Sequence, residues 1–248
     1  GTRGSGKVEA VGAAFNNLNG WHETGLIKLE HRAAFQTCLS NCVLNGVRVV
    51  LGSGSAGIGV AGNTFTSAWE IMDSEPMLIV DGSDSRVSGN SLPTNSIYVY
   101  GSNHVVAGNA CYGWMVQASN TCLEANRSPG WMWVYGDGHR ILSNTAASVL
   151  VRGHRNVLAG NRIGPAPTGI DLQGCHNVVA SNTLAGDFFS YLLFLRVGGS
   201  ISNTLVGNRL LGRCNCAIYT ASDSADNLIY DNYIGSEAFH LTEAGGLR

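Results

Sequence analysis

Hydrophobic and polar positions recur along the chain in a short unit. Between Met77 and Asn109, an alternating apolar segment, a Gly and a polar turn lead twice into a second apolar segment that ends in Asn. The interval from Gly to Asn is eight residues at five places, namely Gly82–Asn90, Gly101–Asn109, Gly136–Asn144, Gly153–Asn161 and Gly174–Asn182. Such a recurrence predicts a repeat protein in which each unit contacts its neighbours.

Alignment on this Asn divides the chain into units of 17 to 27 residues. The aligned residues are Asn17, Asn41, Asn63, Asn90, Asn109, Asn126, Asn144, Asn161, Asn182, Asn208 and Asn232. Three residues earlier every unit has a small or apolar residue: Ala14, Cys38, Val60, Val87, Val106, Leu123, Ile141, Leu158, Val179, Leu205 and Ile229. Two residues later most units are apolar again, from Val43 to Ile234. We expect both columns to be buried, and the Asn residues to stack and bond to one another at a turn.

Units of this length are too short for a helix plus a strand, but they accommodate three short strands joined by tight turns. Alternation with period two places every second residue of a strand inside. Equivalent positions of successive units then stack about 4.8 Å apart, as strands do within a sheet. The pattern predicts a solenoid of β-strands.

The spacing N-x-[aliphatic]-x-G-N appears as NVVASN in Asn177–Asn182 and, with His in the first place, as HVVAGN in His104–Asn109. It resembles the repeat of the right-handed parallel β-helix superfamily, over about residues 7–236. That superfamily includes pectate lyases, polygalacturonases, alginate epimerases, fructan-cleaving transferases and phage tailspikes. The resemblance implies an all-β, single-stranded right-handed parallel β-helix of about eleven short coils. It implies no single activity, because one fold serves many chemistries.

The two ends of the chain depart from the repeat. Residues 1–6 are predicted to be a tag or linker, residues 7–236 the β-helix, and residues 237–248 a C-terminal tail that could cap the last coil. The N-terminal helix that commonly caps such folds is not apparent. We therefore expect either a removed segment or a neighbouring chain over the first coil, and a homo-oligomer with a trimer as the first guess.

The composition limits the classes of partner that the chain is expected to bind. Charged residues are 13 % of the chain and the net charge is −2, which argues against nucleic acid, and no apolar run approaches the length of a membrane span. The seven Cys cannot all pair within one chain, and Cys38 and Cys111 fall on apolar columns, where they read as small core residues. No metal or cofactor motif is recognised, so none is predicted. An extracellular or cell-surface location is expected, although no signal peptide is visible.

The first strand of each coil has outward positions that the alternation identifies. If Ile97 and Val99 point inward, Tyr98 and Tyr100 point outward. The same register turns outward Lys28, Glu30, Asp81, Trp133, Tyr135, Arg152, Asp171 and Gln173. Aromatic rings beside acids and arginines are typical of sugar-binding surfaces. The alternative is that these rings pack against each other, a loop or a neighbouring subunit.

Two classes of function follow. The first is a polysaccharide-active enzyme, of lyase type if Arg152, Tyr135 or Lys28 serves as base or neutralises a uronate, or alternatively a glycoside hydrolase or fructan-type glycosyl transferase using Asp81, Asp171 or Glu30. The second is a non-catalytic glycan-binding or structural rod. We expect Arg152 and Asp171, then Asp81, to be catalytic. The predicted contacts to a polysaccharide or oligosaccharide are Tyr98, Tyr100, Trp133, Tyr135, Gln173, Glu30 and Lys28.

Overall fold

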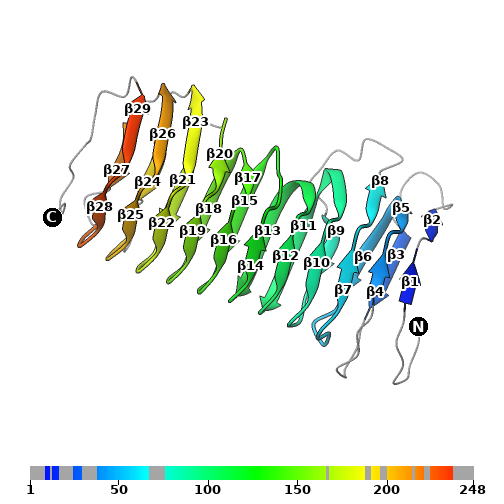
Figure 1. The fold of residues 1–248 in the computed structure, drawn as a ribbon. Coiled ribbons are helices and arrows are strands. Elements are labelled where there is room, and N and C mark those ends of the chain that lie inside the picture. The colour runs from blue at the N-terminus through cyan, green and yellow to red at the C-terminus, as the bar shows by residue number, and fades with distance from the viewer. Residues whose placement is uncertain are drawn as a thin grey trace. The chain divides into compact units, whose positions relative to one another are not determined.

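The computed structural model describes residues 9–11, 13–16, 25–29, 38–66, 76–165, 168–187, 191–195, 200–213, 216–220 and 224–236. The chain forms two compact units, Gly1–Cys122 and Leu123–Arg248. Each is a stack of short parallel strands, and the described ranges contain no helix (Figure 1). No described helix could therefore cross a membrane. The predicted all-β parallel solenoid is confirmed.

In the first unit, parallel strands pair in two series. One series follows the order β1 (Glu9–Val11), β4 (Cys38–Ser40), β7 (Gly59–Ala61), β10 (Arg86–Ser88) and β12 (Val105–Ala107). The other contains β2 (Ala14–Asn16), β5 (Val43–Asn45) and β8 (Thr64–Thr66), together with β3 (Gly25–Leu29), β6 (Val47–Leu51) and β9 (Pro76–Val80). Within this second series, the row that ends in β8 and the row that ends in β9 both pair with β11 (Ser91–Ser102), a long strand. On its other side β11 pairs with β13 (Ala110–Ser119).

The second unit has three parallel rows, and β14 (Cys122–Glu124) crosses the division between the units. The first row is β16 (Arg140–Leu142), β19 (Val157–Ala159), β22 (Val178–Ala180), β25 (Thr204–Val206) and β28 (Leu228–Tyr230). The second is β15 (Trp131–Tyr135), β18 (Ser148–Arg152), β21 (Ile170–Gln173), β24 (Tyr191–Leu195) and β27 (Cys216–Thr220). The third is β17 (Thr145–Ala146), β20 (Arg162–Ile163), β23 (Thr183–Asp187), β26 (Arg209–Arg213) and β29 (Tyr233–Ser236).

Strict alternation builds the interior of each unit. In β15, Met132 and Val134 are fully buried while Trp133 between them faces outward. The predicted apolar column is buried from Val60 to Leu205, every member having no exposed surface, and Cys111 is a core residue as expected. At the last coil Ile229 is only half-buried. Stacked β-branched and leucine side chains thus supply the apolar burial that a solenoid coil cannot supply alone.

The predicted alignment is wrong in the first two coils, and in the second coil it is wrong by one residue. Leu39, not Cys38, pairs in register with the buried Val60, and Leu44 is buried where Val43 is 47 % exposed. Likewise Cys42 rather than Asn41 takes the ladder position, since its N–H donates to Asn63 Oδ1 over 3.0 Å. Asn41 has a φ of 53° and occupies the tight turn that Gly62 and Gly89 fill in the next coils.

In the first coil the alignment is wrong by four residues: Ala10, not Ala14, pairs in register with Leu39, and Ala14 is exposed rather than buried. Ala14 pairs in register with Val43, and the carbonyl of Ala13 accepts the Val43 N–H. Asn17 lies outside the described residues. The displacement is therefore one residue in the second coil and four residues in the first.

The aligned asparagines form the predicted ladder. Within the second unit each backbone N–H donates to the Oδ1 of the next Asn, as from Asn144 to Asn161 over 2.8 Å and from Asn161 to Asn182 over 2.9 Å. The side-chain amides of Asn144, Asn161, Asn182 and Asn208 also donate to the next Asn and to a strand carbonyl, as Asn161 Nδ2 does to Ile141 O. These buried amides satisfy backbone groups at a turn, so their role is structural.

A second ladder runs parallel to it, at the first position of the N-x-[aliphatic]-x-G-N pattern. Asn156, Asn177, Asn203 and Asn227 link successive coils in the same way, and the His139 N–H donates to Asn156 Oδ1 over 2.8 Å. His104 and His139 are therefore turn residues that stand where neighbouring coils have Ser85 and Asn156.

Candidate functional site

Three adjacent strands of the second unit carry aromatic and charged side chains on their outward face. Trp131 and Trp133 lie on β15 with their rings stacked, the centroids 4.4 Å apart and the planes at 30°. Trp133 is 40 % exposed although it sits between two buried residues. Tyr135 follows at the end of the same strand. We call the outward face of β15, β18 and β21 the tryptophan face.

Register brings charged groups beside these rings. Trp133 pairs with Leu150 and then Asp171, whereas Tyr135 pairs with Arg152 and then Gln173. Arg152 is exposed, and its guanidinium carbon lies 5.7 Å from the centre of the Tyr135 ring, within cation–π range.

Arg152 and Asp171 therefore lie on adjacent strands but are not register partners, because Arg152 pairs with Gln173 and Asp171 pairs with Leu150. The Gln173 amide donates to both carboxylate oxygens of Asp171, over 3.3 and 3.4 Å. This bond orients the carboxylate along its own strand. The tryptophan face thus collects five predicted residues: Trp133, Tyr135, Arg152, Asp171 and Gln173.

The first unit has a smaller face of its own. Tyr98 and Tyr100 lie on β11 with ring centroids 6.4 Å apart and nearly perpendicular planes. Burial of Tyr100 raises its pKa, and the neighbouring Tyr98 and Asp81 add to the rise because charge on them opposes a phenolate. Asp81 also accepts the N–H of Gly82 over 2.7 Å. Tyr98, Tyr100 and Asp81 therefore form one cluster.

Lys28 belongs to the same row of the first unit. It is exposed on β3, and the register continues from Lys28 to Val50, Ile79 and Tyr98. Glu30 lies outside the described residues. The predicted contacts are thus distributed over two faces, one in each unit.

Buried histidines stand behind both faces. His104 Nε2 is 2.8 Å from the carbonyl oxygen of Tyr100, and His139 Nε2 is 3.3 Å from that of Tyr135. Both imidazoles are almost completely buried. Burial lowers the pKa of His104, because the charged form loses its hydration. These histidines fix the ends of the strands that carry the tyrosines and are not exposed to a ligand.

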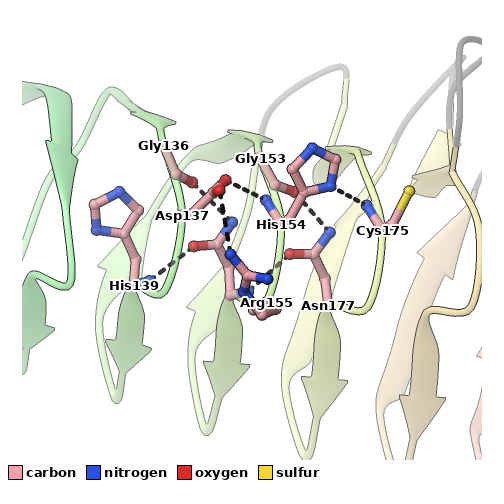
Figure 2. A network of polar contacts seen from close by, with 9 residues as sticks. Gly136, Asp137, His139, Gly153, His154, Arg155, Cys175 and Asn177 are labelled. Atoms are coloured by element: carbon pink, nitrogen blue, oxygen red, sulfur yellow. Dashed lines mark hydrogen bonds and ion pairs between the residues drawn. The ribbon is translucent and has the colours of Figure 1, made fainter.

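Figure 2 shows a polar network at the turns that follow β15, β18 and β21. Asp137 accepts the His154 N–H over 2.8 Å, and His154 Nδ1 accepts the Cys175 N–H over 3.0 Å. Asp137 also lies 3.7 Å from the guanidinium of Arg155. Carboxylate and imidazole are thus used to join successive coils. Among the residues described, no group of three or more His, Cys, Asp or Glu is placed to hold a metal ion.

Sequence reasoning identified the outward rows but missed Trp131. Its signal was available, because Trp131 is two residues before Trp133 and shares its face by simple alternation. The stacking of the two rings depends on side-chain rotation, which alternation does not determine.

Comparison with known proteins places most of the chain in a family. A family model described as Periplasmic copper-binding protein (NosD) matches residues 40–245. No curated protein matches the chain significantly, and no solved structure does so either.

Proposed function

We propose that this chain, which belongs to the family described as Periplasmic copper-binding protein (NosD), acts outside the cytoplasm. There it binds a polysaccharide along the tryptophan face. The stacked pair of Trp131 and Trp133 is the observation that carries the proposal. Aromatic rings held in this way stack on the C–H faces of sugars. The more specific expectation, an extracellular or cell-surface location, stays a prediction.

The charged residues give the face its polar contacts. Arg152 presents a guanidinium that matches a carboxylate or a pair of hydroxyls, and Asp171 accepts hydroxyl hydrogen bonds. Successive coils are about 4.8 Å apart, so a chain of sugars lying across the strands meets a new row of side chains at each coil. Trp133, Arg152 and Gln173 would then contact neighbouring sugars.

A lyase is the second candidate, and the pairing of Tyr135 with Arg152 favours it. In such a β-elimination, a base removes the proton beside a uronate carboxylate, a C=C bond forms, and the glycosidic C–O bond breaks as its oxygen takes a proton. Arg152 would neutralise the carboxylate, which makes that proton more acidic, and Tyr135 would supply the base.

The two-carboxylate chemistry of hydrolases and fructan-type transferases has less support. The register neighbours of Asp171 are Leu150 and Phe194, neither of which is an acid. Asp81 belongs to the other unit. A pair of carboxylates at a set separation is what that chemistry needs.

Copper is the ligand named in the family description. The donors described do not fit a copper site: His154 Nδ1 accepts a backbone N–H, and Asp137 is engaged with His154 and Arg155.

The test is titration of the intact chain with pectate, alginate, inulin and levan, followed by tryptophan fluorescence and calorimetry. Trp133→Ala should weaken binding about five- to thirtyfold, since loss of a stacked aromatic removes roughly 1–2 kcal/mol. Tyr230→Ala is the control, because Tyr230 is 44 % exposed on the β28 strand, away from β15, β18 and β21. Equal binding by wild type and Trp133→Ala would refute the site.

Cleavage is scored separately by the ultraviolet absorbance of the unsaturated product and by new reducing ends. Arg152→Ala that binds but no longer forms unsaturated product supports the lyase. Binding with no product of either kind in the wild type supports the non-catalytic rod. The predicted homo-oligomer, trimer first, is tested by the mass in solution.

A further inference from the structure

A column of arginines runs along the third row of strands in the second unit. The residue after each ladder asparagine is Arg, Thr, Arg, Thr, Arg and finally Tyr. Each pairs with the next in parallel register, through the bridge from Arg127 to Thr145 and the strands β17, β20, β23, β26 and β29 (Figure 1). We call Arg127, Thr145, Arg162, Thr183, Arg209 and Tyr233 the arginine column.

The side chains of the column are open to a ligand. All three arginines are exposed, and their inward neighbours Ile163 and Leu210 are buried, so the arginines face away from the core. In the part of the chain described, none of the three forms an ion pair. Glu124 and Asp231, the acids closest in sequence to the two ends of the column, do not form one with them either.

The last arginine is held by an aromatic ring. The guanidinium carbon of Arg209 is 5.9 Å from the centre of the Tyr233 ring, and Tyr233 is 58 % exposed. An exposed ring beside a guanidinium offers a sugar both a stacking surface and a charge. Binding by positive charge alone does not require an aromatic ring.

The spacing of the charges is regular. Arginine recurs at every second coil, which places successive guanidinium groups about 10 Å apart, with a threonine hydroxyl midway. Two coils are about the length of a disaccharide in an extended chain. Double-stranded DNA has one charge per roughly 1.7 Å, far denser than this column. An anionic membrane requires no particular spacing.

We infer that the arginine column binds a linear acidic polysaccharide that presents one carboxylate per disaccharide toward the protein. Each guanidinium forms a bidentate pair with one carboxylate, which arginine does better than lysine, and no lysine occurs after Lys28. The threonines bond the hydroxyls of the intervening sugars. The site lies on strands other than those of the tryptophan face and does not depend on the function proposed for that face.

The experiment measures the affinity of the intact chain for hyaluronan, which has one carboxylate per disaccharide, with neutral dextran as the reference polymer. The variant R127Q/R162Q/R209Q should lose about tenfold or more in affinity, and its affinity should depend less on salt. The control R86Q/R140Q/R155Q removes the same charge from exposed positions elsewhere and should lose far less.

A second variant tests the spacing at constant charge. R162T/T183R keeps three arginines in the column but separates them by three coils and then one. Its affinity for hyaluronan should fall toward that of the triple variant. Since both changed positions face outward, the melting temperature should stay near that of wild type, and R162Q alone gives a milder test if it does not.

Several results would overturn the inference. Equal losses in the triple variant and its charge-matched control would mean a general charge effect, and wild-type affinity in R162T/T183R would remove the spacing argument. Tighter column-dependent binding to duplex DNA or to anionic phospholipid vesicles than to hyaluronan would assign the column to another partner. Loss of hyaluronan binding in Trp133→Ala, with the triple variant unaffected, would place the site on the tryptophan face.

Discussion

His104 Nε2 lies 2.8 Å from the carbonyl oxygen of Tyr100, while its Nδ1 lies 3.2 Å from the N–H of Ser85. The second contact requires an unprotonated Nδ1, because it accepts the Ser85 hydrogen. The first requires a proton on Nε2, which donates to the carbonyl. A single neutral tautomer therefore satisfies both bonds, and it fixes the end of the strand on which Tyr98 and Tyr100 lie.

Stability should fall as the solution becomes acidic. Burial lowers the pKa of His104 from its ordinary 6.5, so below about pH 6.5 the unfolded chain binds a proton that the folded chain still excludes. The free energy of unfolding is then largest above pH 6.5 and decreases toward the folded pKa, by at most about 1.4 kcal/mol per pH unit for one proton. Urea unfolding between pH 7.5 and 5 measures this slope.

The variant His104→Asn isolates the contribution of this side chain. Asn fills the equivalent place at Asn156 and Asn177, so the fold has room for it. We expect a shallower slope below pH 6.5 in the variant. An unchanged slope would assign the acid sensitivity to other groups.

The asparagine ladder should cost more to break in the middle than at its end. Asn161→Ala removes the acceptor of the Asn144 N–H and the donor to the Ile141 carbonyl, leaving both buried groups unpaired. The expected loss is about 2–4 kcal/mol. Asn232→Ala removes the acceptor for Asn208 at a half-buried position, where water can replace it, and should cost about half as much or less. Thermal and urea unfolding of the two variants provide the comparison.

The periodicity of the sequence determined the solenoid and its faces, because inward and outward residues alternate strictly and a buried charge is costly. It did not determine where the first coils begin. Asn41 resembles a ladder residue, but it serves the left-handed turn beside Cys42, so everything aligned on it shifted by one. A one-residue slip in a strand exchanges its buried and exposed faces.

The candidate site was predictable to the same extent. Alternation identified Trp133, Arg152 and Asp171 as outward residues. The Gln173–Asp171 bond and the stacking of Trp131 on Trp133 depend on side-chain rotation, which a pattern does not encode. The arginine column was readable from the residue after each ladder asparagine, but recognising it required attention to charge as well as hydrophobicity.

The corrected register makes its own prediction. Leu44→Ala should cost about 2–5 kcal/mol, as expected for a large buried residue, because Leu44 has no exposed surface. Val43→Ala should change stability by about 0.5 kcal/mol or less, since Val43 is 47 % exposed. The uncorrected alignment predicts the reverse order. Urea midpoints of the two variants therefore decide between them.

Two glycines with positive φ should respond very differently to alanine. At Gly101 φ is 91°, and an added Cβ would collide with the carbonyl oxygen of Gly82, which accepts the Ser102 N–H in the native turn. The backbone of that coil would have to move away from its neighbour. At Gly108 φ is 63°, and an added Cβ meets nothing within 4 Å.

The comparison of Gly101→Ala with Gly108→Ala separates steric contact from backbone preference. Gly108→Ala should cost only the left-handed conformation, about 1–2 kcal/mol, and Ala125 already adopts a φ of 52°. Gly101→Ala should cost several kcal/mol of stability or prevent folding, because the cost of moving the coil adds to the cost of the left-handed conformation. Melting temperatures and soluble yield measure both. Similar losses in the two variants would show that neighbouring coils do not approach as closely at Gly101 as this stacking requires.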